Sequence, residues 1–469
     1  MSSDGNTNKN YTLPLVTLTS LFFMWGFITC MNDVLIPHLK KLFSLSYFES
    51  MLIQFCFFGA YFIGSLIYFL ISYYKGDPIN RIGYKKGILL GLLLSAIGCC
   101  MFFPAATLAA YGLFLSALFI LGLGFTLLQI SANAYVSLLG PEDTASSRLN
   151  LTQAFNSLGT TIAPVLGGYL VLQFFAVNGV ISAESTRIPY LIFAGLFILL
   201  GVIIAFVRLP QFTSEEIESK GLGALKFMNL RLGVLGIFFY VGGEVAIGSF
   251  IISFLGQHNI AGFTEAVSKN YLALYWGGAM IGRFLGAISL NKGIGQVKKI
   301  IYMVLTAAAV FALIFSIVDL TFLQISYFLI FIVLNLLAFL VGRSSPGKTL
   351  AIFASVNVVL LLITIFTGGH LAMWTILGIG LFNSIMYSNI FTLSIAGLGK
   401  YTSQGSSLLV MAILGGAVVP VIQGAVADFA GIQKALFLPV ICYLYLIYFG
   451  YYCWRHLANV EVTAVKGGH

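Results

Sequence analysis

Two carboxylic acids lie within long apolar stretches and are the residues best suited to carry ion chemistry. Asp33 follows Asn32 toward the end of the first apolar stretch, and Glu244 lies near the middle of a later one. An ionisable side chain inside a membrane is costly, so each is a functional candidate by default. A buried carboxylate can bind a proton or, as a hard oxygen ligand, a sodium ion. We therefore expect cation coupling at Asp33, Asn32 and Glu244, the alternative being a satisfied polar contact between helices.

Carboxamide side chains recur at helical spacing along three other apolar stretches. Gln129 and Asn133 are four residues apart and share one helix face. Gln153 and Asn156 form a similar stripe, and Asn383 belongs to a third. Because amides both donate and accept hydrogen bonds, these stripes suit the hydroxyls of a neutral sugar or polyol. We expect them to line a polar cavity, while hydrogen bonding between helices is the alternative for each amide taken alone.

Three further residues have a possible role beside these polar groups. Trp276 could stack on a sugar ring, although most aromatic side chains in a chain with 42 Phe and 23 Tyr must serve packing. Arg81 lies in a short cationic loop, and Arg283 lies at a similar position in the second part of the chain. Both could pair with acidic groups and latch one face of a helix bundle. Anchoring at the membrane surface is the alternative for both arginines.

The composition indicates which elements must position these residues. The chain has 469 residues, of which 59% are hydrophobic and only 8% charged, with a mean hydropathy of +0.99. A soluble domain carries about 25% charged residues. A cytosolic enzyme, a nucleic-acid binder and a disordered scaffold are therefore excluded. Fourteen apolar stretches are each long enough to cross a hydrocarbon core of about 30 Å. They lie near residues 13–36, 48–74, 87–104, 108–138, 149–174, 188–208, 230–256, 267–290, 298–317, 321–341, 349–367, 370–397, 404–428 and 434–455.

The distribution of basic residues predicts the orientation of these helices. With the N-terminus inside, nineteen Lys and Arg residues fall on the inner side and five on the outer side. Because inner loops are enriched in positive charge, both termini are expected in the cytoplasm. No nucleotide-binding, hydrolase or metal-site motif stands in a usable context. The sequence thus predicts a membrane protein that is not an enzyme and needs no cofactor.

An internal repeat divides the chain into two halves. The motif at Leu121-Gly122-x-Gly124 recurs at Leu377-Gly378-x-Gly380, and Gly159 recurs as Gly415, in both cases 256 residues later. Near the start of each half the offset is 216 residues, which leaves 40 residues for two extra helices. We therefore predict an N-terminal six-helix bundle (1–209), a cytoplasmic linker (210–229) and a C-terminal six-helix bundle (230–469) with a hairpin inserted at about 298–342. Parallel repeats of this kind place a substrate site between the halves near mid-membrane.

Six motifs carry a resemblance to a known family. They are FMWGFITCMNDVLIPHL (23–39), LIQFCFFGAYF (52–62), LNLTQAFNSLG (149–159), YVGGEVAIGS (240–249), YWGGAMIGRF (275–284) and FNSIM (382–386). Together they resemble the fucose and glucose/galactose permease branch of the major facilitator superfamily. The resemblance implies an all-helical membrane protein of the major facilitator fold, here with fourteen helices because of the hairpin. It also implies a secondary active importer of a monosaccharide in a bacterial inner membrane.

The resemblance also implies roles for individual residues. In the fucose permease pattern, an Asp on helix one and a Glu on helix four serve proton coupling and sugar binding. Asp33 matches the first, whereas Gln129 stands where the Glu would be. An acid is present instead at Glu244, as in glucose/galactose members, some of which are coupled to sodium. Gln153 and Asn156 match the amides on helix five.

These considerations lead to one expected function and two alternatives. We expect symport of a glucose- or galactose-like hexose with a cation, sodium being favoured over a proton, and with Asp33 as a possible sodium ligand. The partners would be the sugar and the lipid bilayer, with no nucleic acid, and the protein would work as a monomer. A proton-coupled symporter of fucose or N-acetylglucosamine is one alternative. A non-transporting sugar receptor or scaffold is the other.

Overall fold

The structure is a computed structural model that describes residues 12–75, 78–139, 145–175, 182–207, 223–290, 295–343, 345–398 and 402–457. Every regular element within these ranges is helical, and no strand is present among them. The prediction of an all-helical chain is confirmed. Much of the predicted linker at 210–229 lies outside the described residues, which resume with the short helix η5 (Gly223–Lys226).

Six membrane-crossing segments precede that linker, and three of them contain more than one element. The elements are α1 (Thr12–Leu42), α2 (Tyr47–Lys75), the short α3 (Pro78–Ile82), α4 (Tyr84–Cys100) with α5 (Phe102–Thr107), α6 (Tyr111–Leu138), α7 (Ala145–Ile162) with η2 (Ala163–Gly167) and η3 (Leu170–Phe174), and η4 (Ala183–Thr186) with α8 (Arg187–Phe206). Around Pro164, α7 passes into two π-helical turns, because proline cannot donate the backbone hydrogen bond that a regular helix needs there.

Eight segments follow the linker. The elements are α9 (Met228–Leu255), α10 (Glu265–Ser289), α11 (Gln296–Ile317), α12 (Phe322–Ile325) with α13 (Phe328–Gly342), α14 (Pro346–Phe366), α15 (Gly369–Asn383) with α16 (Met386–Ile395), α17 (Thr402–Met411) with η7 (Ala412–Leu414) and α18 (Gly415–Ala430), and α19 (Ile432–Ala435) with α20 (Phe437–His456). Among the described residues, thirteen segments are long and apolar enough to cross a membrane. The fourteenth long helix is α10, whose 25 residues include Glu265, Lys269 and Arg283.

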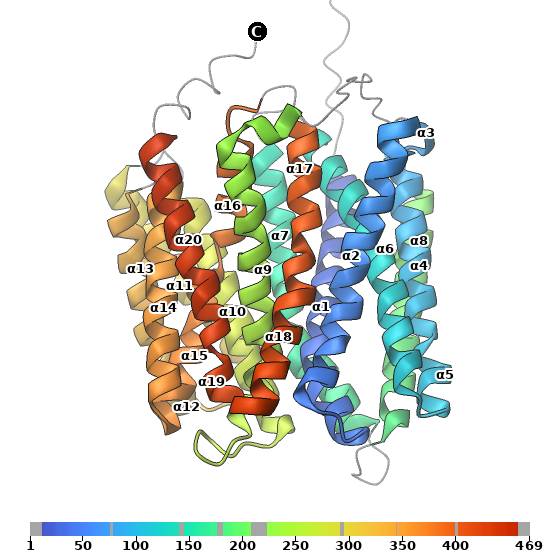
Figure 1. The fold of residues 1–469 in the computed structure, drawn as a ribbon, viewed down its shortest axis with the longest axis horizontal. Coiled ribbons are helices and arrows are strands. Elements are labelled where there is room, and N and C mark those ends of the chain that lie inside the picture. The colour runs from blue at the N-terminus through green and yellow to red at the C-terminus, as the bar shows by residue number, and fades with distance from the viewer. Residues whose placement is uncertain are drawn as a thin grey trace, which may run out of the picture.

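The helices form two groups that lie side by side (Figure 1). Those of the first half pack around α1 and α6, and those of the second half pack around α9 and α15. In the first half α4 packs against α6 and α8, and in the second half α14 packs against α15 and α20 in the same way. The hairpin of α11 to α13 covers α10 and α15 from outside this arrangement. Two six-helix bundles with an additional hairpin are therefore present, as predicted.

Glycines allow the closest helix contacts at related positions in the two halves. A methyl group added at Gly159 of α7 would lie 2.2 Å from the carbonyl oxygen of Phe23, and one added at Gly415 of α18 would lie 1.8 Å from that of Phe238. Such distances are far below van der Waals contact, so any larger residue must push the helices apart. The repeat seen in the sequence thus corresponds to one packing contact used twice.

This packing predicts that Gly415→Ala destabilises the protein by about 1–3 kcal/mol, the usual cost of overpacking a close contact. Gly195→Ala is the matched control, because nothing lies within 4 Å of an added methyl group on that exposed face of α8. In the control, alanine should be neutral or stabilising by about 0.5–1 kcal/mol. Thermal unfolding of the purified proteins in detergent measures both. Equal melting temperatures for the two variants would contradict the assigned contact.

Candidate functional site

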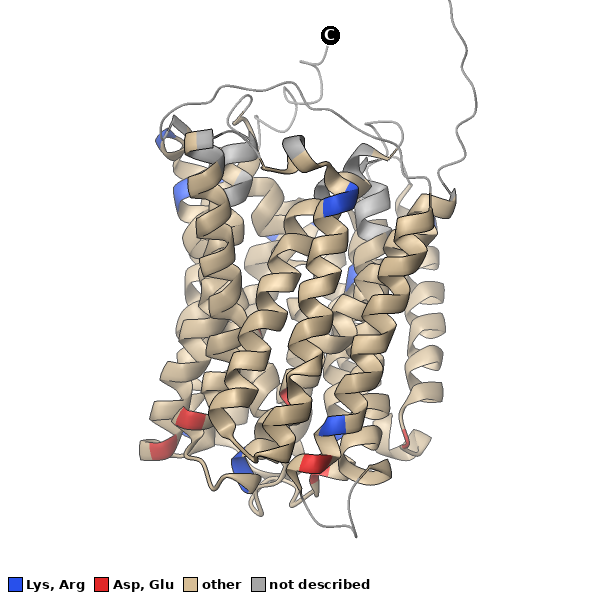
Figure 2. Ribbon diagram, turned by 90° about the vertical axis from the view of Figure 1, so that its right-hand side faces the viewer, with Lys and Arg blue, Asp and Glu red and all other residues tan. Residues whose placement is uncertain are grey.

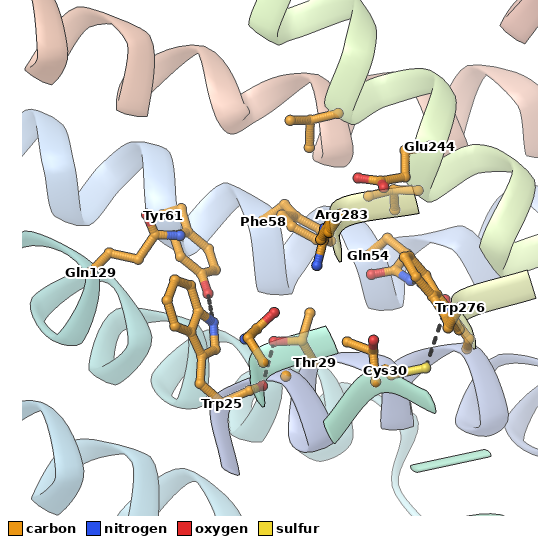
Figure 3. Close-up of a pocket in the computed structure, with 16 residues that line it drawn as sticks. Trp25, Thr29, Cys30, Gln54, Phe58, Tyr61, Gln129, Glu244, Trp276 and Arg283 are labelled. Atoms are coloured by element: carbon orange, nitrogen blue, oxygen red, sulfur yellow. Dashed lines mark hydrogen bonds between the residues drawn. The ribbon is translucent and has the colours of Figure 1, made fainter. Parts of the chain in front are cut away.

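A cavity of about 720 Å³, including its opening, lies between the two halves (Figure 3). Its walls come from α1, α2, α6 and α7 of the first half and from α9 and α10 of the second. The lining side chains are Trp25, Thr29, Cys30, Asp33, Gln54, Phe58, Tyr61, Gln129, Asn156, Thr160, Val241, Glu244, Val245, Trp276 and Arg283, together with Gly26.

Asp33 is buried at one end of this cavity and accepts hydrogen bonds from both halves. Within the first half, the amide nitrogen Nε2 of Gln54 lies 3.1 Å from Oδ1 and the thiol of Cys30 lies 3.8 Å from Oδ2. From the second half, Trp276 donates its indole N–H to Oδ2 at 3.2 Å. Ser249 donates to Oδ1 at 3.4 Å. One carboxylate therefore joins helices α1, α2, α9 and α10.

The surroundings of Asp33 supply donors but no positive charge. Among the described residues, the four side chains that contact the carboxylate are uncharged. Gln54 also donates to the hydroxyl of Ser249 at 2.9 Å, which adds a bond between the halves. Asn32 is fully buried beside this group, 3.5 Å from Oε1 of Gln54, and its own Oδ1 has no partner. A buried charge with such neighbours is incompletely compensated, so the site is suited to take up a cation.

Glu244 occupies the second-half wall of the cavity. The hydroxyl of Tyr240, one turn earlier on α9, donates to Oε1 at 2.7 Å. Arg283 interacts with this carboxylate electrostatically. Its guanidinium also donates to the hydroxyl of Ser157 in the first half and, at 3.4 Å, to the backbone oxygen of Ser384. Arg283, predicted as a latch at the end of a helix, thus also points into the cavity (Figure 3).

Aromatic and amide groups of the first half form the opposite wall (Figure 3). Trp25 donates its indole N–H to the hydroxyl of Tyr61 at 3.0 Å, and Gln129 is hydrogen-bonded to the same hydroxyl. Asn156 donates its side-chain amide N–H to the backbone oxygen of Phe22 at 3.0 Å, which connects α7 to α1. Both amides line the cavity, and the wall offers flat rings next to hydrogen-bonding groups.

The structure therefore brings most of the predicted residues together, but not all. Asp33, Gln129, Asn156, Glu244, Trp276 and Arg283 line the cavity. Asn32 lies behind the lining, and Gln153 is half-buried on α7 outside it. Asn133 lies on α6 and Arg81 on α3, but the side chains of both are outside the described part of the structure.

Asn383 was expected in the cavity and is instead buried within the second half. Its Nδ2 donates to Tyr275 at 2.9 Å, and its Oδ1 accepts from Asn357 at 2.8 Å and from Tyr443 at 2.7 Å. Its backbone oxygen accepts from Tyr240 at 3.2 Å, because the helix is interrupted directly after Asn383 between α15 and α16. Since Tyr240 also holds Glu244, Asn383 supports the cavity wall from behind.

Three cavity residues on α2 were not among the predicted site residues. Gln54, Phe58 and Tyr61 follow one another at intervals of four and three residues, the spacing of one helix face. That pattern was available in the sequence. Phe58 and Tyr61 alone could not be distinguished from packing residues in so aromatic a chain. Gln54 was the informative signal, because an amide in an apolar helix needs a partner.

Comparison with known proteins assigns nearly the whole chain to one protein family. Residues 16–357 match the Major Facilitator Superfamily. The chain is 45% identical over 455 residues to a protein of Brucella abortus named glucose/galactose transporter, with 96% of each chain covered. It is 31% identical to the L-fucose-proton symporter of Escherichia coli, with 96% of this chain and 95% of the other covered. A crystal structure of the fucose:proton symporter from that organism superposes with a TM-score of 0.65 at 30% identity, covering 95% of this chain and 99% of the other.

The geometry predicts different consequences for two amides of the site. Asn383→Ala removes the partner of Tyr443 and Asn357 and one of the two partners of Tyr275 in a closed interior, so we expect a loss of about 2–4 kcal/mol in unfolding free energy. Gln129→Ala opens space that water in the cavity can fill, so its loss should stay below about 1 kcal/mol. Thermal unfolding in detergent compares the two. If Asn383→Ala were more stable than Gln129→Ala, the hydrogen bonds assigned to Asn383 would be wrong.

Proposed function

The chain belongs to the major facilitator superfamily, whose members move substrates through a site between two halves, and we propose that it imports a hexose by symport with a proton. The observation that carries this proposal is the position of Asp33. A titratable carboxylate at the substrate cavity accepts hydrogen bonds from both halves. The same side chain can therefore bind the cation, line the cavity and connect the two halves.

The chemistry of the cavity supports a neutral sugar as cargo. Gln129 and Asn156 offer amide oxygens and nitrogens, and Glu244 offers an acceptor on the facing wall. These groups suit hydroxyls distributed around a ring. Trp25 and Trp276 supply flat apolar surfaces on opposite sides. The name of the Brucella relative, glucose/galactose transporter, makes these two hexoses the first candidates.

Coupling follows from what protonation does to Asp33. An ionised carboxylate only accepts hydrogen bonds, whereas a protonated one has a donor and fewer acceptor sites. Protonation therefore weakens the bonds from Trp276 and Ser249 that join the halves at this end. A proton then favours separation of the halves there, and sugar bound between the walls favours closure. Such differential affinity for two states couples the two fluxes.

A proton fits this arrangement better than the sodium ion favoured from the sequence alone. The neighbours of Asp33 direct N–H, O–H and S–H groups at it, whereas sodium requires several oxygen ligands. Among the buried side-chain oxygens of the described residues, Oδ1 of Asn32 has no partner, and one such oxygen is fewer than sodium needs. The relative named L-fucose-proton symporter also supports proton coupling within this family. We therefore propose the proton as the coupling ion.

We further propose that the protein lies in a bacterial inner membrane with both termini cytoplasmic and works as a monomer. The described acidic residues outside the interior gather at the lower end of the molecule, where α5, α12 and α19 lie (Figures 1 and 2). They are Glu49, Glu184, Glu265, Asp319 and Asp428. Nineteen of the 24 Lys and Arg residues are expected on the opposite side, and cytoplasmic ends are enriched in these residues, so this lower end would face outward. The division into halves at 210–229 belongs to the same proposal.

Uptake into proteoliposomes tests the function directly. We expect radiolabelled glucose or galactose to accumulate when an inward proton gradient is imposed and not when a sodium gradient is imposed alone. Collapse of the proton gradient by an uncoupler should stop accumulation but leave exchange. Accumulation driven by sodium alone would overturn proton coupling. Binding of sugar without any flux would favour a receptor, and transport of fucose or N-acetylglucosamine instead would change the cargo.

Asp33→Asn should separate coupling from translocation. The variant keeps a hydrogen-bonding side chain but has no titratable proton, so uphill uptake should fall at least about tenfold, since the proton supplies the driving force. Counterflow exchange of labelled sugar should persist. Glu184→Gln removes a carboxylate from the molecule's lower end without touching the cavity and serves as the control. Concentrative uptake by Asp33→Asn at the rate of this control would exclude Asp33 as the coupling group.

A further inference from the structure

The start of α2 is capped in two different ways. Within the first half, Ser46 and Glu49 bond reciprocally. Glu49 donates its backbone N–H to the Ser46 hydroxyl at 3.1 Å, and its carboxylate accepts the backbone N–H of Ser46 at 2.8 Å. This capping box satisfies two of the backbone donors at the helix start. It leaves the backbone N–H groups of Tyr47 and Phe48 without a partner in their own half of the molecule.

A carboxylate from the other half accepts hydrogen bonds from both of these N–H groups. Asp428, near the end of α18, accepts the N–H of Tyr47 at 2.6 Å through Oδ1 and that of Phe48 at 2.7 Å through Oδ2. Close packing holds the two helices in register, since a methyl group added at Gly424 would lie 2.7 Å from the backbone oxygen of Tyr47. Charge-assisted bonds to a helix N-terminus are stronger than neutral ones and gain from the helix dipole.

Other helices of the two halves are also joined at this end. Lys41, at the end of α1, forms an ion pair of 2.6 Å with Glu265 at the start of α10. On the next turn of α10, the Lys269 ammonium lies 3.5 Å from the backbone oxygen of Val165 in η2 and over the ring of Tyr169. Both halves thus contribute charged groups to the closure of the lower end (Figures 1 and 2).

We propose that Asp428 and the start of α2 form a latch that holds the lower end of the molecule closed. Under the orientation and alternating-access function proposed above, on which this inference rests, that end is the outer mouth of the cavity. Opening it separates α18 from α2 and exposes two backbone N–H groups and a carboxylate to water. Because Asp428 is itself exposed, water can replace the lost bonds, so the latch opens readily. Its role is to set the equilibrium between the state that is open at the lower end and the state that is open at the opposite end.

The test measures access to the cavity from each side in the full-length protein. Cys30 lines the cavity, and with Cys56, Cys99, Cys100, Cys442 and Cys453 replaced it becomes the single reporter. A membrane-impermeant maleimide labels it in right-side-out and in inside-out vesicles. Neither sugar nor an ion gradient is required, so a wrong cargo or coupling ion leaves this measurement valid. If the orientation of the chain were reversed, the two vesicle types would simply exchange results.

We expect Asp428→Asn, which keeps one accepting oxygen and loses the negative charge, to raise labelling of Cys30 from the lower side about fivefold, the scale of one lost hydrogen bond to a charged group, and to lower labelling from the opposite side. Glu49→Gln is the matched control, because it disturbs the same helix start through a contact confined to the first half. In this control, labelling of Cys30 from each side should equal that of the parent protein. Unchanged rates in Asp428→Asn would overturn the latch. Increased labelling from both sides would also overturn it, because that pattern indicates a loosened fold rather than a shifted equilibrium.

Discussion

The arrangement depends on one constraint, which is that a carboxylate buried in an apolar bundle must have its charge compensated. Asp33 obtains only uncharged donors, and it takes them from both halves. That partial compensation makes the site responsive to a cation. It also makes the contact between the halves depend on the charge of one residue. The proposed coupling therefore needs no long pathway, since the proposed ion site and the contact between the halves are the same place.

The second half supports the cavity in a different way. Asn383 forms hydrogen bonds with Asn357, Tyr275 and Tyr443, and through Tyr240 it stabilises the wall that holds Glu244. Hydrogen bonds of this kind hold the helices of one half together, whereas a buried carboxylate with incompletely compensated charge can respond to a cation. The molecule thus combines a wall supported by hydrogen bonds in one half with a responsive carboxylate in the other. The interface between them can then change without unfolding either half.

The additional hairpin leaves this machinery intact. Helices α11 to α13 lie against α10 and α15, and none of their residues lines the cavity. An even number of extra crossings preserves the direction of every later helix. The helices around the cavity can therefore keep the packing seen in the half without a hairpin, and the match to the fucose:proton symporter extends over 95% of the chain.

Apolar length and glycine spacing are local properties of a chain, so the membrane class, the positions of the fourteen long helices and the internal repeat could be predicted without the fold. Asp33 and Glu244 could be identified in the same way, because charge within an apolar helix is conspicuous. Which polar groups face the cavity could not be predicted and is known from the folded structure. Asn383 and Gln129 are both amides in apolar helices, yet one is buried in a network and the other lines the space between the halves. That difference depends on how each helix is rotated by its neighbours, which contacts between distant segments determine.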